Sequence, residues 1–200
     1  MLPIALDLRG ESVLIVGGNR EAALRATSLC AEGARVSVIA PTAVPELSAL
    51  AARRVVHWYV RPFSLEDARG CRLVFVADGD ESVAQALHAA RRRLGYWLCV
   101  VDRTDLTDAL GMATLRAGPV RVAVSSSATA PGLSRHVRQE LERLFDGRFA
   151  HFAERVAAYR SGLAPENRRE GMRRALAGLR IDGNMQYPLW EGDETAVPDA

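Results

Sequence analysis

The sequence predicts an α/β fold with a doubly wound parallel sheet, followed by a small α+β module and a C-terminal helical segment. Three observations lead to this prediction. Short, mostly apolar runs of strand length recur through the first half of the chain, as expected for strands buried on both faces. Helical segments separate these runs, and helical crossovers connect parallel strands. After residue 111 the pattern changes to a hairpin followed by helices.

The expected elements of the first half alternate along the chain. The segments expected to be strands are 12–16, 35–39, 55–60, 73–77 and 97–101. The segments expected to be helices are 20–32, 45–53 and 81–94. Gly33 stops the first helix and Pro41 stops the second strand, because these residues commonly end such elements. The order predicts a Rossmann-like sheet.

The second half is expected to begin with a hairpin, because two short apolar segments, 112–116 and 120–125, flank a turn at Gly118. The segment 131–145 is expected to be an amphipathic helix, because its apolar residues recur at spacings of three and four. These residues are Leu133, Val137, Leu141 and Leu144. Further helices are expected at 148–161 and 165–179.

The change of pattern predicts four consecutive parts. They are a Rossmann-like dinucleotide-binding domain, a dimerisation module of hairpin and helix, a helical domain and a loose acidic tail, at 1–111, 112–147, 148–180 and 181–200. The last part is expected to be loose because it combines two prolines and two glycines with five acidic residues and no arginine.

Composition excludes several classes of function. The 200 residues are 48% hydrophobic and 25% charged, as in an ordinary globular protein. All 26 basic residues are arginine, so a Schiff-base lysine and a P-loop lysine are excluded. The three cysteines are widely spaced, which excludes a disulfide scaffold and fits the cytoplasm. With dispersed basic residues and no apolar run of about 20 residues, we expect neither nucleic-acid binding nor membrane insertion.

A glycine-rich turn follows the first expected strand. Gly17, Gly18 and Asn19 lead into a helix that continues through Ala22, in the outline of GxGxxA. Such a turn brings bare backbone close to a pyrophosphate and directs a helix N-terminus at it. The motif favours dinucleotide binding, the alternative being a plain turn of an α/β fold. The second strand ends without a carboxylate, so the residues alone leave NAD and NADP open.

Two further features lie where ligands bind in open α/β sheets. Asp102 follows a buried strand directly, at the sheet edge where a carboxylate can remove or relay protons. Position alone equally allows it to cap the next segment. The loop 125–129 carries four hydroxyls before a helix and can bind an anion, or can simply cap that helix. Cys99 is best interpreted as a buried structural thiol.

The order and spacing of these motifs resemble those of the precorrin-2 dehydrogenase family, the NAD-dependent module found alone or at the N-terminus of siroheme synthase. The resemblance covers about residues 1–180. It is carried by Leu2-Pro3-Ile4, Gly17-Gly18-Asn19, the run Gly33-Ala34 through Ala40-Pro41, Cys99-Val100-Val101-Asp102 and Ala123-Val124-Ser125-Ser126. This sequence departs from the family at Asn19, Cys99, Ala84 and Ala113.

The resemblance implies an oxidoreductase that converts precorrin-2 to sirohydrochlorin with NAD, in siroheme or cobalamin biosynthesis. It places the essential acid on Asp102 and a serine that some relatives phosphorylate on Ser126. The implied cofactor contacts are Gly17, Gly18, Asn19, Arg20, Glu21, Pro41, Thr42 and Asp78. The implied contacts to the polycarboxylate tetrapyrrole are Ser125, Ser126 and Arg135.

The family resemblance also implies a homodimer and, in bifunctional relatives, insertion of Fe²⁺ or Co²⁺ into the product. No resident metal site is expected, because the four histidines lack ligand spacing. Two alternatives stay open. A chelatase-only member would use Asp102 and tolerate the altered glycine turn at Asn19. A descendant without catalysis would bind a tetrapyrrole and not convert it.

Overall fold

The computed structural model describes residues 2–182, so most of the predicted tail lies outside the described residues. The chain divides into two compact units. One unit combines Met1–Leu115 with Val122–Arg143, and the other combines Arg116–Arg121 with Leu144–Ala200. The predicted domain boundaries remain a prediction. Below, residues 2–111 are called the sheet region and residues 113–182 the C-terminal region.

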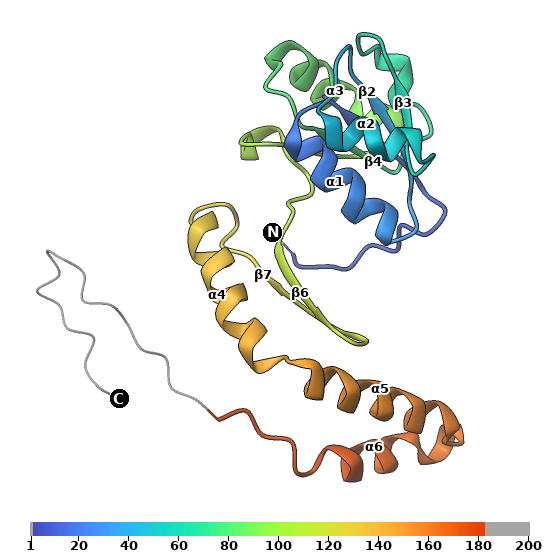
Figure 1. Cartoon of the computed structure of the whole chain (residues 1–200), viewed down its shortest axis with the longest axis vertical. Coiled ribbons are helices and arrows are strands. Elements are labelled where there is room, and N and C mark those ends of the chain that lie inside the picture. Colours follow the sequence, from blue (N-terminus) through green and yellow to red (C-terminus); the bar gives the residue numbers. More distant parts are fainter. Residues whose placement is uncertain (1, 183–200) are drawn as a thin grey trace, which may run out of the picture. The chain divides into compact units, whose positions relative to one another are not determined.

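The sheet region contains five parallel strands in the order β3-β2-β1-β4-β5. Figure 1 labels β2, β3 and β4 of this sheet and the helices α1, α2 and α3. Their bounds are β1 Ser12–Val16, β2 Arg35–Ile39, β3 His57–Tyr59, β4 Leu73–Val76 and β5 Trp97–Val100. In register, Val13 of β1 lies opposite both Val36 and Leu73, and Leu73 lies opposite Trp97. This is the predicted doubly wound sheet. Strand β3 is shorter than predicted, and it is an edge strand that pairs only with β2.

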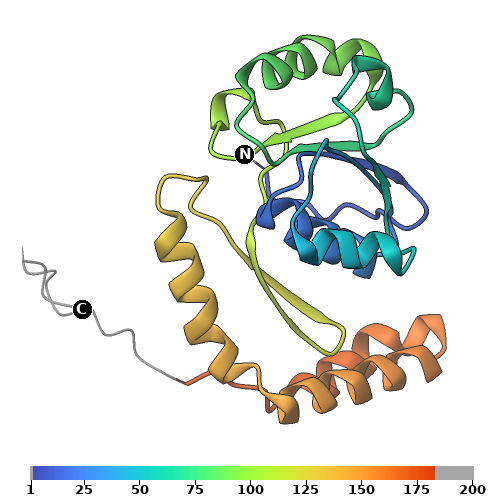
Figure 2. The ribbon, with the colours of Figure 1, turned by 45° about the horizontal axis from the view of Figure 1, so that its top comes forward.

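Alternate residues of the strands enter two separate cores, one on each face of the sheet. Helices α1 (Arg20–Ala31) and α2 (Pro45–Ala52) cover one face, and their Ala26 and Leu47 pack with Ile15 in the first core. Helix α3 (Glu81–Leu94) and the short η1 (Leu65–Ala68) cover the other face. Figure 2 shows α3 and the pair α1–α2 on opposite sides of the strands. Burial on both faces explains why β4 and β5 are continuously apolar.

The strands end together at one edge of the sheet. Backbone hydrogen bonds continue the ladders one residue beyond the strand ends, from Gly17 N to Ile39 O at 3.0 Å and from Ala77 N to Val16 O at 2.8 Å. Val101 N likewise donates to Val76 O at 3.1 Å. The loops after β1, β2, β4 and β5 therefore start side by side, although they are far apart in sequence.

The C-terminal region begins with β6 (Ala113–Ala117) and β7 (Val120–Val124), which form a two-stranded sheet. The predicted turn is present, with Gly118 at a φ of +58°. Three helices follow: α4 Pro131–Leu144, α5 Gly147–Gly162 and α6 Arg168–Leu176. The predicted helix 165–179 is wrong in its bounds, because the chain first forms a 3₁₀ turn, η3 (Pro165–Asn167), and α6 then ends at Leu176.

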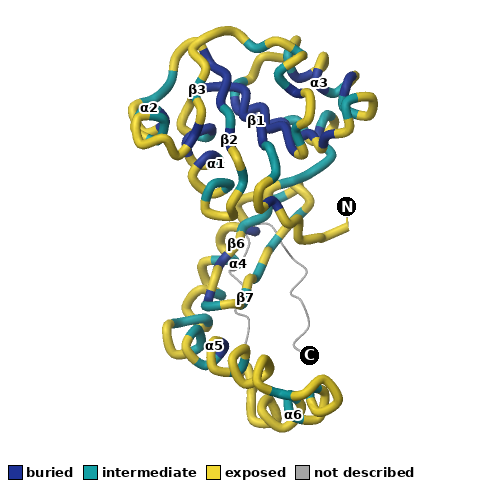
Figure 3. Tube along the Cα trace, turned by 90° about the vertical axis from the view of Figure 1, so that its right-hand side faces the viewer, coloured by how far each residue is buried: buried dark blue, intermediate teal, exposed yellow. Residues whose placement is uncertain are grey.

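Burial differs between the two regions (Figure 3). Among the described residues after position 100, the buried hydrophobic ones are Leu115, Ala117 and Ala153. Helix α4 is present as predicted, yet Leu133 and Leu144 on it are 60% and 51% exposed. Within the described part of the chain, every helix falls short of the length and apolarity needed to cross a membrane.

Candidate functional site

The turn after β1 brings bare backbone against two neighbouring loops. Gly17 has a φ of +117°, which favours glycine, and a Cβ there would lie 2.5 Å from Cγ of Asp78. A Cβ on Gly18 would overlap the carbonyl oxygen of Thr42. The Gly18 carbonyl also accepts a hydrogen bond from Val44 N at 2.8 Å. Close packing therefore requires both glycines, and the predicted tight turn is present.

Asn19 is the N-cap of α1, with an extended backbone rather than a left-handed one. Its Oδ1 accepts a hydrogen bond from Ala22 N at 2.9 Å, and its Nδ2 donates to the Ala77 carbonyl at 2.8 Å. Asparagine is a preferred N-cap because its oxygen satisfies a helix N–H. Asn19, which replaces a glycine of the motif, thus connects α1 to the end of β4. Both polar atoms of its side chain form hydrogen bonds within the protein.

The start of α1 fits an anionic cofactor. The first N–H groups of a helix lack partners inside the helix, and the helix dipole adds partial positive charge there. Asn19 satisfies Ala22 N, which leaves the N–H groups of Arg20 and Glu21 for a ligand. Arg20 is exposed and forms no ion pair within residues 2–182. Free N–H donors at a helix start directly after a glycine turn are what a dinucleotide pyrophosphate requires.

The loops after β2 and β4 complete the surroundings of the glycine turn. Pro41 and Thr42 are exposed, and the Thr42 backbone packs on Gly18. The half-buried Asp78 holds its carboxylate against Gly17. A carboxylate repels phosphate and accepts hydrogen bonds from hydroxyls. Asp78 is therefore suited to a ribose hydroxyl and unsuited to a phosphate oxygen.

Asp102 lies directly after β5, in a left-handed conformation with a φ of +59°. The residue is exposed, and its carboxylate makes no hydrogen bond or ion pair to any described residue. Asparagine and aspartate tolerate this backbone conformation better than most residues. The alternative interpretation, a capping acid, finds no capping hydrogen bond here. The carboxylate is free to accept a proton from a ligand.

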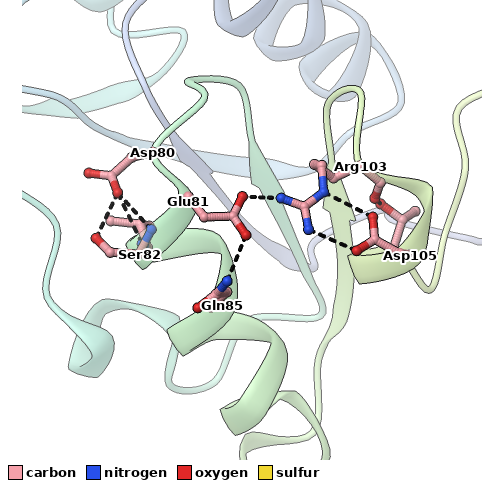
Figure 4. Close-up of polar contacts among 8 residues, drawn as sticks. Asp80, Glu81, Ser82, Gln85, Arg103 and Asp105 are labelled. Carbon is pink, nitrogen blue, oxygen red and sulfur yellow. Dashed lines mark hydrogen bonds and ion pairs between the residues drawn. The ribbon is translucent and has the colours of Figure 1, made fainter.

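A polar network holds the loop after Asp102 (Figure 4). Arg103 donates from Nε and Nη2 to the two carboxylate oxygens of Asp105, at 2.9 and 2.8 Å. Its Nη1 bonds to Glu81 at the start of α3, and Gln85 donates to the other oxygen of Glu81 at 2.7 Å. These hydrogen bonds from Arg103 lower the pKa of Asp105. The network therefore anchors the loop to α3 through a charged pair.

Two further contacts fix the same loop to the outer edge of β5. Thr107 Oγ1 accepts a hydrogen bond from Val100 N at 2.9 Å, and Asp108 Oδ2 accepts one from Leu98 N at 3.2 Å. Side chains here replace the missing neighbour strand and cover the sheet edge. Contacts on both sides of Asp102 thus hold its uncommon backbone conformation, as is typical at functional positions.

A cavity of about 300 Å³ lies within the first compact unit. Its lining includes the three residues predicted to contact the tetrapyrrole, Ser125, Ser126 and Arg135. Two polar residues that sequence reasoning missed, Arg25 of α1 and the buried Ser134 of α4, also line it. The lining includes neither Asp102 nor the glycine turn. Nothing in the spacing of the sequence links Arg25 to a loop 100 residues later.

The serine loop keeps donors for a ligand. Ser125 Oγ accepts from Ser127 N at 3.0 Å, and Ser126 Oγ accepts from Ala130 N at 3.0 Å. A hydroxyl that accepts one bond still has its O–H to donate. Ser127 and Ala128 have φ values of +51° and +65°, so the loop turns sharply through two left-handed residues. Ser126 therefore supports the start of α4 and still faces the cavity.

Cys99 is buried on β5, as the interpretation of a structural thiol predicts. Burial raises the pKa of its thiol, which disfavours the reactive thiolate. Across residues 2–182, no three His, Cys, Asp or Glu side chains gather in a group that could hold a metal ion. The polar groups that the described residues present at the sheet edge include the carboxylates of Asp78 and Asp102, the guanidinium of Arg20 and backbone N–H groups.

Residues 4–111 match the family described as "Putative NAD(P)-binding", and the chain belongs to this family. The chain is 36% identical over 182 residues to the siroheme synthase of Methylococcus capsulatus, which covers 88% of this chain and 38% of that protein. It is 33% identical over 202 residues to the siroheme synthase of Nitrosomonas europaea, covering 99% of this chain and 42% of that one. The chain thus spans about two fifths of the curated relatives it matches.

The fold is similar to a solved structure titled "SirC, precorrin-2 dehydrogenase", with a TM-score of 0.75 and 22% sequence identity. The match covers 87% of this chain and 88% of that chain. The likeness therefore extends beyond the sheet region, which is about half of this chain, and includes elements of the C-terminal region. A nicotinamide cofactor is the ligand class of the family.

Proposed function

We propose that this NAD(P)-binding chain is an oxidoreductase that dehydrogenates precorrin-2 to sirohydrochlorin with NAD, in siroheme or cobalamin biosynthesis. One observation carries the proposal. The glycine turn that suits a dinucleotide and the unpaired carboxylate of Asp102 both lie at the carboxyl ends of the same sheet. This edge is where open α/β sheets bind ligands. Similarity to siroheme synthases and to a precorrin-2 dehydrogenase supplies the substrate class.

The cofactor would lie across the turn after β1. The N–H groups of Arg20 and Glu21 would take the pyrophosphate, and Asp78 would accept a hydrogen bond from a ribose hydroxyl. Residues 40–44 contain no arginine to accommodate a 2′-phosphate, which favours NAD over NADP. We expect kcat/KM to be higher with NAD⁺ than with NADP⁺. The opposite order would contradict the choice of cofactor without affecting the substrate.

The chemistry requires removal of a hydride and a proton from the tetrapyrrole. A bound nicotinamide supplies the hydride acceptor. Asp102 would accept the proton on a carboxylate oxygen, and the contacts of Arg103, Thr107 and Asp108 would keep that carboxylate in place. Ser125, Ser126 and Arg135 would hold carboxylates of the substrate, since hydroxyls and guanidinium groups donate to carboxylates.

The C-terminal region would complete the enzyme as a homodimer. Leu133 and Leu144 of α4 remain exposed in the single chain, and an exposed apolar helix face is typical of an interface. A second subunit would cover this face.

Metal insertion is the second candidate activity. The exposed Asp102 carboxylate could accept protons displaced from the pyrrole nitrogens by Fe²⁺ or Co²⁺, which here are substrates. The structure removes one reason to favour a chelatase-only protein, because the side chain of Asn19 is engaged by Ala22 and Ala77 within the turn.

The decisive test is an anaerobic assay with precorrin-2 and NAD⁺ that follows NADH and the sirohydrochlorin spectrum. Asparagine tolerates the left-handed backbone conformation as aspartate does, but it cannot act as the base. We therefore expect Asp102→Asn to lower kcat by about 10²- to 10⁴-fold. Asp182→Asn, another exposed aspartate, should leave the rate unchanged. Loss of activity at Asp102 with an unchanged melting temperature would support the proposal.

Absence of NADH formation by the folded wild-type protein would overturn dehydrogenation. A following assay with sirohydrochlorin and Fe²⁺ or Co²⁺ would then separate the two remaining alternatives. Metal insertion that depends on Asp102 would identify a chelatase. Tetrapyrrole binding without either reaction would identify a non-catalytic descendant of the family.

A further inference from the structure

We infer that Arg25 is a substrate-positioning residue that binds one carboxylate of the tetrapyrrole in the cavity lined by Ser126, Ser134 and Arg135. This inference rests on the proposed function for the identity of the substrate. Arg25 lies on α1, the helix whose start receives the cofactor, and lines the cavity from that side. It is therefore a side chain through which the cofactor helix itself would contact the substrate.

The guanidinium of Arg25 is held in place on three sides. Its Nε donates to Glu21 Oε1 at 2.7 Å, one helical turn earlier. Its Cζ lies 5.1 Å from the centre of the Phe75 ring, close enough for a cation–π contact. Its Nη1 lies against Gly111, where an added Cβ would be only 2.8 Å away. A cation fixed in this way loses little further freedom when it binds a ligand.

The held geometry leaves a defined part of the guanidinium for a ligand. Glu21 occupies Nε, and within the described chain neither Nη1 nor Nη2 of Arg25 donates a hydrogen bond. Adjacent Nη1 and Nη2 groups match the two oxygens of a carboxylate. Arg135 forms no ion pair with any residue from 2 to 182. The cavity thus offers the guanidinium of Arg135, the two Nη groups of Arg25, whose Nε is ion-paired with Glu21, and serine hydroxyls, a set that fits an anion with several oxygens.

The chemical class of the ligand follows from this set. A planar carboxylate receives paired hydrogen bonds from a guanidinium, and neighbouring hydroxyls can complete its hydrogen bonding. The volume of about 300 Å³ holds an acidic side chain of the tetrapyrrole and leaves the macrocycle outside the cavity. Arg25 would therefore fix the orientation of the macrocycle relative to the cofactor.

Two measurements test this role. Uroporphyrin, an octacarboxylate tetrapyrrole that is not the proposed substrate, serves as a binding probe by fluorescence titration. The steady-state assay gives KM for precorrin-2 and KM for NAD⁺. We expect Arg25→Met to weaken uroporphyrin binding and raise KM for precorrin-2 by about 10- to 100-fold, the usual range for hydrogen bonds to a charged group. KM for NAD⁺ should change less than about twofold.

Gly111→Ala provides a second variant that keeps the charge. The new Cβ would displace only the end of the flexible Arg25 side chain, so the protein should fold. The affinity of Gly111→Ala for uroporphyrin should lie between the affinities of the wild-type protein and of Arg25→Met. Arg92→Met is the matched control, because Arg92 is exposed on α3 and does not line the cavity. It removes the same charge and should leave binding unchanged.

The outcomes separate this inference from the proposed function. Unchanged uroporphyrin affinity in both Arg25→Met and Gly111→Ala would overturn the inference even if dehydrogenation is observed. A change confined to KM for NAD⁺ would also overturn it, because Arg25 would then act through Glu21 on the cofactor. Weakened uroporphyrin binding in a protein without dehydrogenase activity would support the carboxylate site and reject the dehydrogenase. Absence of uroporphyrin binding by wild type would overturn the inference.

Discussion

The sheet region and the C-terminal region use their apolar residues differently. In the sheet region, alternate residues of β1, β2, β4 and β5 enter two cores, and side chains such as Ile15, Leu47 and Leu98 are fully buried. In the C-terminal region, α6 has no buried residue, and its Glu170 pairs with Arg173 and Arg174 instead. Such exposed local pairs are screened by solvent and contribute little to stability.

The difference indicates where stability and binding reside. The two hydrophobic cores stabilise the sheet region without a ligand. The loops at its carboxyl edge can therefore carry groups that have no partner in the described chain, such as the Asp102 carboxylate. The C-terminal region buries few side chains within the chain. Helix α6 has 9 residues, fewer than an isolated helix needs to be stable in water, so it needs further contacts. We therefore expect the two regions to respond differently to the same kind of substitution.

The largest effect on stability should come from the core of the sheet. Leu98→Ala removes a fully buried side chain and should lower the free energy of unfolding by about 2–5 kcal/mol. Leu176→Ala on α6, where the leucine is 37% exposed, should cost less than about 1 kcal/mol. Urea unfolding of both variants measures the difference. Equal losses would show that the C-terminal region has a core as important as that of the sheet.

The next effect should be on association. Leu133→Asp places a charge on the exposed apolar face of α4 and should convert a dimer to a monomer, since a buried unpaired charge opposes association. Leu24→Asp is the matched control, because Leu24 is 55% exposed on α1. Light scattering after size exclusion gives the mass. A wild-type monomer, or a dimeric Leu133→Asp variant, would reject α4 as the interface.

A smaller effect should appear as a pH dependence of the sheet region. Tyr96 is buried and donates to the Leu87 carbonyl at 2.6 Å, and burial raises its pKa to about 12. Its ordinary pKa is about 10. The unfolded chain therefore ionises first as pH rises, so the stability contributed by Tyr96 is complete below pH 10 and is lost between about 10 and 12.

Unfolding in urea at pH 8 and pH 11 measures this contribution. Between pH 8 and pH 11, the free energy of unfolding should fall by about 1 kcal/mol more for the wild-type protein than for the Tyr96→Phe variant. Tyr59→Phe, at a residue that is 47% exposed, should behave as wild type. A Tyr96→Phe variant with the wild-type pH dependence would assign the loss to other groups.

The smallest effect concerns the serine loop. Ala128 is left-handed, so Ala128→Gly relieves about 1 kcal/mol of backbone strain and adds a comparable entropy to the unfolded chain. We expect a change within about 0.5 kcal/mol, in the direction of greater stability. Ala130 does not have a left-handed conformation, so Ala130→Gly relieves no strain there. It should lower the free energy of unfolding by about 0.4–1 kcal/mol. Equal destabilisation of both variants would indicate that the loop is not held in this conformation.

Much of the sheet region could be predicted from the sequence. The strands 12–16 and 35–39 and the helix 81–94 have the predicted bounds, because their apolar patterns and their flanking glycine and proline residues are local signals. The glycine turn was also predictable, since close backbone packing at Gly17 and Gly18 excludes other residues. Asp102 was identifiable by its place directly after a buried strand.

Other features depend on contacts between distant segments. Asn19 departs from a motif, and only the position of the Ala77 carbonyl explains why the residue fits. Arg25 has its place because Glu21, Phe75 and Gly111 meet around it. No local pattern encodes such a meeting, so the tetrapyrrole contacts that the family resemblance implied, Ser125, Ser126 and Arg135, did not include Arg25.

The sequence by itself determined the order and type of the elements, because hydrophobic periodicity and turn residues act over a few positions. The tertiary structure decided which loops lie together and which side chains stay uncommitted. It alone shows that Leu133 and Leu144 of α4 remain exposed and that Asp102 is held left-handed by contacts on both sides. The physical reason is that tertiary packing pairs some polar groups within the protein and leaves others free to bind a ligand. Which groups are paired depends on all the neighbours of each residue, and these come from distant parts of the sequence.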